Sequence, residues 1–327
     1  MIILAVLVAL PLCGAMYQAW CVHREAKRFP PPGRFIDIGG RRLHLLCIGK
    51  GEPTVVFEGG AFQGSVSEEA VRTEVSSQTQ VCSYDRVGTG WSDPGSGSPI
   101  TSGQLADDLR LLLERAAVQP PYILVPSSMG GLTVEMFARR YPERVAGLVF
   151  VDAGYSAILE RGLATIGSQY PQRVCLARWA ARIGLLRLLD PFGMRRSPGA
   201  GSARGVALLY RAEPMDSLCA IARGLPQSAQ EFREAPPFPP DVPLVVLSHD
   251  NSSGFIPPGV GFMSRDPRFT SLMEQWTPLE EQLSKRSRQG SFRIVAGSNH
   301  MIANTQPHVV ATAILEMVSR LRQQSGH

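Results

Sequence analysis

The chain has 327 residues, of which 44% are hydrophobic and 19% are charged, and its net charge is +5 with a pI near 9.0. This is a globular composition with enough apolar material for a sizeable core. The mild positive charge alone gives no case for nucleic acid binding, so we predict none. Six cysteines in this length predict no disulfide framework, and Cys47 and Cys82 fall in strand-like runs where they would act as small buried hydrophobes.

The first 22 residues, MIILAVLVALPLCGAMYQAWCV, carry no charged side chain. As a helix they would span about 33 Å, which is enough for the core of a bilayer. We predict a single-pass membrane anchor over residues 1–22 and a linker over 23–34. The positive charges after the apolar run favour the cytoplasmic side for the rest of the chain. A cleaved signal peptide is an alternative, but a basic n-region and a small-x-small cleavage site are missing; a helix buried in the core is another.

Apolar runs alternate with helical patterns along the rest of the chain. RFIDIGGRRLHLLCIG has the pattern of a hairpin that turns at Gly39-Gly40, and residues 104–118 form an amphipathic helical pattern. Further strands are predicted at residues 54–57, 80–84, 122–125, 145–151, 244–247 and 292–295. Strands that alternate with helices favour a mostly parallel sheet covered on both faces.

The alternation breaks between Gly154 and Pro240, where amphipathic pieces such as residues 176–189 appear instead of strands. We predict a helical cap over residues 155–240, inserted between a first part of the core at 35–154 and a second part at 241–327. The stretch from 154 to 240 carries eleven arginines against six acidic residues. This charge fits a solvated helical face, or a surface that meets anionic lipid or anionic substrates.

One segment, YILVPSSMGG, leaves a strand and enters a helix with almost no loop between them. Such a turn pushes a serine oxygen out above the sheet edge and directs the next backbone N–H at any oxyanion that forms. Ser128 is therefore the candidate nucleophile and the Met129 N–H a candidate oxyanion donor. A plain N-cap serine is the alternative for Ser128. A second donor is expected from Gly60 or Ala61, in the glycine-rich turn after the strand at 54–57.

A serine nucleophile needs a general base, and His300 is the candidate because it lies between the last predicted strand and the last helix. His249 ends the preceding strand and is a candidate for a supporting position. Cysteine and histidine spacings typical of a metal site are missing, so we predict neither a metal nor a cofactor.

The motifs together resemble the α/β-hydrolase superfamily, in particular a group with a membrane-spanning N-terminus. The matching segments run in order over nearly the whole chain: PPPGRFIDIGGRRLHLLCIGKGEPTVVFEGG, YDRVGTGWSDPG, SSMGG, RRYPERVAGLVFVDA and GSNHMIANTQPHVV. The resemblance implies the α/β-hydrolase fold with a cap, Ser128 as nucleophile and His300 as base. The family's elbow is usually Gly-His-Ser-x-Gly, whereas Pro126 and Ser127 precede the nucleophile here.

The resemblance leaves two positions open for the triad acid. An ungapped count beyond the strand at 244–247 places Ser252 in the usual slot, with Asp250 two residues earlier. Asp152, at the end of the strand after the nucleophile helix, is the position that some superfamily members use. The register favours Asp152 over Asp250.

The function predicted from these residues is a membrane-anchored serine hydrolase that cleaves carboxylic esters of small or lipid-like molecules. Ser128 argues against dehalogenases and epoxide hydrolases of this fold, because those use an aspartate nucleophile. The alternative is a catalytically silent hydrolase-fold protein that binds a ligand or partner beneath its cap.

Overall fold

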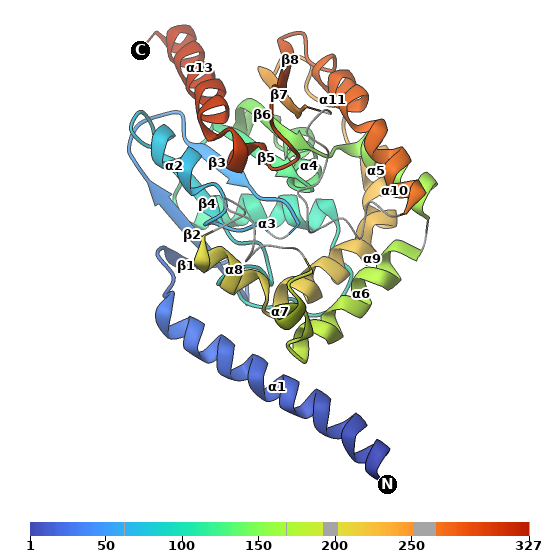
Figure 1. The fold of residues 1–327 in the computed structure, drawn as a ribbon. Helices are drawn as coiled ribbons and strands as arrows, with labels where there is room; N and C mark the ends of the chain where they lie inside the picture. The colour runs from blue at the N-terminus through green and yellow to red at the C-terminus, as the bar shows by residue number, and fades with distance from the viewer. Residues whose placement is uncertain (62, 168, 192–201, 251–265, 327) are drawn as a thin grey trace.

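The computed structural model describes residues 1–61, 63–167, 169–191, 202–250 and 266–326 (Figure 1). Within these ranges eight strands form one sheet in the order β1-β2-β4-β3-β5-β6-β7-β8. The first three strands in this order pair antiparallel and the others pair parallel, which confirms the mostly parallel sheet. The strands are β1 (Arg34–Asp37), β2 (Arg42–Ile48), β3 (Val55–Glu58), β4 (Val81–Tyr84), β5 (Tyr122–Ser128), β6 (Val145–Ala153), β7 (Leu244–His249) and β8 (Gly290–Val295).

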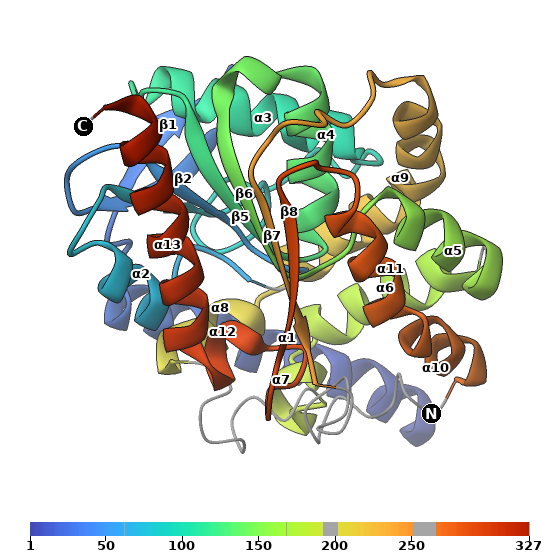
Figure 2. The same ribbon diagram turned by 90° about the horizontal axis from the view of Figure 1, so that it is seen from above.

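Helices cover both faces of the sheet, as Figure 2 shows. On one face pack α3 (Ser102–Arg115), α4 (Gly130–Arg140) and α11 (Trp276–Ser284); on the other pack α2 (Glu69–Val75) and α13 (Pro307–Ser325). Alternate residues of the central strands enter opposite cores: Leu124 faces α3 and α4, while Ile123 and Val125 face α2 and α13. Both faces are therefore buried, which explains the continuous apolar runs in the sequence. The short helices α10 (Pro267–Glu274) and α12 (Ile302–Thr305) flank α11 and α13 along the chain.

Helix α3 begins two residues earlier than predicted. Thr101 caps it, because the Thr101 side chain accepts from the Gln104 N–H and the Gln104 side chain accepts from the Thr101 N–H. The predicted hairpin is confirmed: β1 and β2 pair antiparallel around Gly39 and Gly40, whose positive φ angles of 112° and 89° suit glycine.

The segment between β6 and β7 contains only helices among its described residues: α5 (Ser156–Ile166), α6 (Gln169–Arg182), α7 (Leu185–Leu189), α8 (Ala203–Leu209) and α9 (Glu213–Glu234). The amphipathic piece predicted over 176–189 is divided, because Gly184 with φ 69° separates α6 from α7. Trp179 of α6 and Leu189 of α7 are exposed. The first helix of this cap is anchored to the core by Ser156, whose N–H and Oγ both donate to the buried carboxylate of Glu135 at 2.6 and 2.9 Å.

Four of the cysteines form two disulfides, which corrects the prediction that Cys47 and Cys82 are separate buried hydrophobes. They lie directly opposite each other on the antiparallel neighbours β2 and β4, with their Cα atoms 4.1 Å apart. Cys175 and Cys219 join α6 to α9 within the cap. Pairing depends on strand register and on helix packing, so the sequence separations of 35 and 44 residues gave no signal.

Alkylation of free thiols is expected to show how many cysteines are paired in disulfides. Denatured, unreduced protein should take up a maleimide at Cys13 and Cys21 only, because these are the free cysteines. After reduction all six should react, which intact-mass spectrometry resolves as two and then six adducts. Six adducts without reductant would contradict the pairing.

The N-terminal segment folds as one long helix, α1 (Ile2–Arg28), that runs along the outside of the molecule (Figure 1). Over the residues whose placement is described, the structure contains no helix that is long and apolar enough to cross a membrane. The anchor predicted for residues 1–22 is not supported by this finding.

Candidate active site

Ser128 lies at the sharp turn between β5 and α4. Its φ of 49° is unusual for a residue other than glycine, and α4 begins two residues later at Gly130. A side chain at Gly130 would overlap the carbonyl oxygen of Glu58, and one at Gly131 would overlap that of Gly154. The two glycines therefore let the start of α4 lie close against the ends of β3 and β6, the strands on either side of Ser128. Pro126 is accommodated inside β5, opposite Glu58 of β3.

Three residues from different elements meet at this turn. The Ser128 Oγ lies 2.9 Å from His300 Nε2, and His300 Nδ1 lies 2.6 Å from Asp152 Oδ2. Asp152 is fully buried near the end of β6, which neighbours β5, and His300 precedes α12. The edge of Trp276 packs against the His300 ring at a centroid distance of 5.7 Å. The structure thus brings together a serine, an imidazole and a carboxylate in the order that nucleophilic catalysis requires.

Asp152 is held by a second histidine at the end of β7. His249 Nδ1 lies 2.9 Å from Asp152 Oδ1, so each carboxylate oxygen has its own imidazole partner. Burial alone would raise the pKa of Asp152, but the hydrogen bond from His249 and the charge and hydrogen bond of His300 outweigh it. The pKa of Asp152 therefore lies well below its usual value, and the group is ionised at neutral pH.

The other acid candidate, Asp250, is placed differently. Its Oδ2 accepts from the Gly297 N–H at 3.1 Å, and its own N–H donates to the Ser298 carbonyl at 3.3 Å. These contacts tie Asp250 to the turn after β8, whereas Asp152 faces His300. Ser252 lies outside the described residues.

Glu280 of α11 is a further buried carboxyl beside Asp152 that sequence reasoning missed. Burial and the charge of Asp152 raise the pKa of Glu280 well above its usual value, so its carboxyl group is neutral. No motif marks this position, because the contact arises from the packing of α11 on β7.

The three candidate oxyanion donors are not equivalent. The Met129 N–H belongs to the residue after Ser128, at the N-terminus of α4. The Gly60 N–H donates to Gln63 Oε1 at 2.6 Å, and the Ser127 Oγ donates to the same oxygen at 2.7 Å. The Gly60 N–H is therefore already engaged by the side chain of Gln63, a residue that sequence reasoning also missed. Of the two candidates in this turn, the hydrogen bonds of the described residues leave Ala61 for a substrate oxyanion.

Arg86 holds the turn that carries these donors. Its guanidinium pairs with the buried Glu58 at 2.7 Å and also donates to the carbonyl oxygens of Gly59 and Gly60. Both side chains of the ion pair are almost fully buried. The pair therefore fixes the end of β3 where the turn begins.

Replacing Arg86 with methionine is expected to lower the free energy of unfolding by about 3 to 5 kcal/mol, because Glu58 is left buried without its cationic partner. Urea unfolding measures this change. Arg293→Met is the matched control, since Arg293 pairs with Glu316 at the exposed surface and should change stability by less than about 1 kcal/mol. Equal effects of the two variants would contradict the role given to Arg86.

Glu68 is a buried carboxyl close to the strand end of Ser127, with its Oε1 3.5 Å from the Ser127 Oγ. Burial raises the pKa of Glu68 to about 7. Between roughly pH 4.5 and pH 7 the folded chain keeps this proton while the unfolded chain releases it, so stability falls as pH rises through that window. The total loss is about 3 kcal/mol.

The variant Glu68→Gln is therefore expected to be more stable than the wild type by up to about 3 kcal/mol near pH 8, and little different near pH 4.5. Urea unfolding at the two pH values checks this. Glu69→Gln, at the exposed neighbouring position, is the control and should show no such pH dependence. A constant difference between Glu68→Gln and the wild type at both pH values would contradict the prediction.

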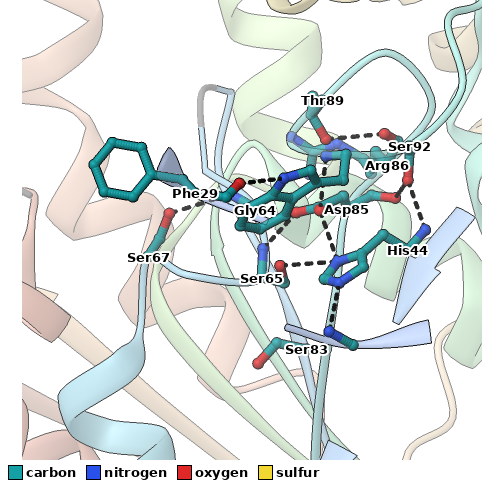
Figure 3. A network of polar contacts seen from close by, with 12 residues as sticks. Phe29, His44, Gly64, Ser65, Ser67, Ser83, Asp85, Arg86, Thr89 and Ser92 are labelled. Carbon is teal, nitrogen blue, oxygen red and sulfur yellow. Dashed lines mark hydrogen bonds and ion pairs between the residues drawn. The ribbon is translucent and has the colours of Figure 1, made fainter. Parts of the chain in front are cut away.

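A second cluster contains serine, histidine and aspartate but has a different geometry (Figure 3). His44 Nδ1 faces both Asp85 Oδ2 at 2.9 Å and Ser65 Oγ at 3.2 Å, while Nε2 accepts from the Gly33 N–H at 3.0 Å. Both ring nitrogens are occupied, and the side chains of His44 and Asp85 are fully buried. This cluster ties the linker after α1 to the core and provides no base for catalysis. Among the described residues no group of three or more His, Cys, Asp or Glu side chains is arranged to hold a metal ion.

Comparison with known proteins agrees with the fold. A family model described as alpha/beta hydrolase fold matches residues 53–174. An uncharacterized protein of Schizosaccharomyces pombe is 34% identical over 155 residues, covering 47% of this chain and 28% of that protein. A cis-3-alkyl-4-alkyloxetan-2-one decarboxylase of Shewanella oneidensis is 32% identical over 122 residues, covering 37% of this chain and 38% of that protein.

The matches thus span well under half the length of these two curated relatives. Among solved structures, a thermophilic esterase from Thermogutta terrifontis aligns with a TM-score of 0.61 and 21% identity, over 88% of this chain and 98% of that one. The matched segment contains Ser128 and Asp152, and the aligned fold extends over most of the chain. Residues 53–174 thus match the alpha/beta hydrolase fold model, and the fold over most of the chain is similar to that of the esterase.

Proposed function

We propose that this protein is a serine hydrolase that cleaves carboxylic esters through an acyl-enzyme. The observation that carries the proposal is the chain of contacts from Ser128 Oγ through His300 to Asp152, at 2.9 and 2.6 Å. A serine in this place supports acyl transfer, because its oxygen can attack a carbonyl carbon.

In the proposed reaction His300 Nε2 takes the Ser128 proton as the oxygen attacks the ester carbonyl. Asp152 holds the ring with Nδ1–H directed at its carboxylate and stabilises the imidazolium that forms. The Met129 and Ala61 N–H groups stabilise the oxyanion of the tetrahedral intermediate. The C–O bond to the alcohol then breaks and His300 gives its proton to the leaving oxygen. Water, deprotonated by His300, then attacks the acyl carbon; the bond to Ser128 Oγ breaks, the acid leaves and His300 returns the proton to Ser128.

The esterase among the aligned structures and the decarboxylase among the curated relatives support an ester-like carbonyl as the target. The ring that the decarboxylase is named for, an oxetan-2-one, is itself a cyclic ester. Pro126 and Ser127, which depart from the usual elbow, would favour the catalytically silent alternative if they distorted the turn. Neither displaces the elbow, since Ser128 keeps its positive φ and Ser127 points to Gln63.

A fluorophosphonate probe tests the proposal, because it reacts only with an activated serine. The folded full-length protein should be labelled and the heat-denatured protein should not. Before labelling, the folded protein should hydrolyse a panel of p-nitrophenyl esters of increasing acyl length, and labelling should abolish this activity. A folded protein that neither takes the probe nor hydrolyses any ester would favour the silent alternative.

We also propose that α1 anchors the protein to a membrane and that the hydrolase domain lies on the oxidising side. The exposed apolar side chains of α1 support anchoring; they include Ile3, Leu7, Leu10, Leu12 and Met16. The two disulfides support the oxidising side, because such bonds persist mainly outside the cytosol. The two disulfides outweigh the positive charges after residue 22, because the charge rule has little force for one apolar segment.

A further inference from the structure

The C-terminal half of α1 is held against the cap by buried polar contacts. Gln18 is only 5% exposed; its Nε2 donates to the Tyr210 carbonyl at 2.7 Å and its Oε1 accepts from Arg187 Nε at 2.9 Å. The same Arg187, 1% exposed, pairs through Nη2 with Glu25 Oε2 at 2.9 Å. A buried guanidinium that is satisfied from another helix indicates a fixed contact.

The backbones of α1 and the cap also meet closely. A side chain at Gly14 would overlap the carbonyl oxygen of Ile183, and one at Gly184 would lie 3.1 Å from Tyr17 Cδ1. Gly14, Gln18 and Glu25 recur on one face of α1, so this face rests on the turn between α6 and α7 and on the α7 helix that follows. The orientation of the cap relative to α1 is therefore set from residue 14 onward.

This docking places the cap next to the part of α1 that precedes Gly14. Residues 2–13 of α1 extend about 18 Å as a helix before the first docked position. Helices that lie in the interface bury their apolar face by about 5 to 10 Å. An α1 that enters a bilayer along its free length therefore brings the docked cap to the lipid surface.

The cap helices next to α1 carry side chains suited to that surface. Leu188 is 67% exposed and Trp179 57% exposed, and the other exposed apolar residues of α6 and α7 are Leu176, Leu185 and Leu189. The guanidinium groups of Arg178 and Arg182 lie over the Trp179 ring, 5.1 and 5.2 Å from its centroid. Trp20 of α1 has Arg24 over its ring at 4.6 Å. Tryptophan beside arginine is typical of the boundary between apolar chains and anionic headgroups.

We propose that α1 and the helices α6 and α7 form one membrane-binding surface, with this part of the cap immersed in the headgroup region of an anionic bilayer. The proposal rests on the proposed anchoring by α1 and adds the cap as a second contact. It favours lipid-soluble esters as substrates, since the cap and the membrane then share one boundary.

Quenching of tryptophan fluorescence by brominated lipid tests the proposal. The full-length chain in a Ser128→Ala background is reconstituted into vesicles of phosphatidylglycerol and phosphatidylcholine, with bromine placed near the headgroup end of the acyl chains. Trp20→Phe and Trp179→Phe isolate the signal of each side chain, and the double variant gives the background from Trp91 and Trp276. Both Trp20 and Trp179 are expected to lose fluorescence above this background.

Two other results overturn the proposal and differ in what they say about anchoring. Quenching of Trp20 alone would mean that α1 inserts while the cap stays in water. Quenching of neither would remove the anchoring as well. Because the readout needs no catalysis, neither result bears on the serine hydrolase assignment.

Vesicle partitioning gives a second measurement. The double variant Leu176→Glu, Leu188→Glu should bind anionic vesicles roughly tenfold more weakly or worse, because two apolar side chains no longer enter the lipid. Ile294→Glu is the matched control: Ile294 is 58% exposed on β8, away from α1 and the cap, and its change should leave binding unaffected. Equal binding by the cap variant and the control would refute the cap contact.

Discussion

Replacing Ser128 with alanine is expected to abolish labelling by a fluorophosphonate and to lower kcat for ester hydrolysis by roughly 10⁵- to 10⁶-fold. The Oγ that His300 Nε2 faces at 2.9 Å is the only atom removed, so the acyl-enzyme cannot form. Labelling is read by in-gel fluorescence and hydrolysis by release of p-nitrophenol.

Ser127→Ala is the matched control, one residue away in the same strand. Its hydroxyl donates to Gln63 Oε1 and has no contact with His300 among the described hydrogen bonds. This variant should keep its label and most of its activity, with at most a modest loss from a looser Gln63. A label lost in Ser127→Ala and kept in Ser128→Ala would mean that the nucleophile is misassigned.

Asp152→Asn is expected to lower kcat by about 10³- to 10⁴-fold, while Asp250→Asn keeps most of the activity. The Asp152 carboxylate accepts from His300 at 2.6 Å and from His249 at 2.9 Å, one histidine on each charged oxygen. An asparagine amide is uncharged and has only one oxygen, so it cannot replace both contacts. His300 then loses the partner that fixes its Nδ1–H tautomer and stabilises its charged form. Asp250 instead accepts from the Gly297 N–H, a contact that an amide oxygen can also make.

Thermal melts of both variants are required, because a buried group is changed in one and a half-buried group in the other. Both should still fold in a cooperative transition. If Asp250→Asn were the inactive variant and Asp152→Asn the active one, the acid would come from the loop after β7 and the register argument would fail.

Local sequence patterns predicted much of the fold, because apolar runs and glycine turns determine structure over only a few residues. The hairpin at Gly39-Gly40 and the predicted strand runs needed no long-range information. Asp152 could be proposed from its place at a strand end next to the strand of Ser128. Strand lengths were underestimated where polar residues continue a strand, as in β5, which runs on through Pro126 to Ser128.

The parts that sequence reasoning missed depend on packing between distant segments. Glu280 reaches Asp152 only because α11 packs on β7, and Gln63 reaches Ser127 only because the turn after β3 folds back beside β5. The contact of Arg187 with Glu25 joins residues 162 positions apart. No periodicity or spacing marks such pairs, since each residue alone fits an ordinary charged or polar helix position.

The bond between Ser156 and Glu135 has a consequence for how this protein can diversify. The cap leaves the core only three residues after Asp152, yet Ser156 is fastened to a carboxylate that Arg139 and Arg286 also hold at 2.5 and 2.7 Å. That fastening holds the end of β6, which carries Asp152, in place at the point where the cap begins. The remaining triad member, His300, enters from beyond the cap. The cap sequence between Ser156 and β7 can therefore vary while the two flanking parts that build the site stay unchanged.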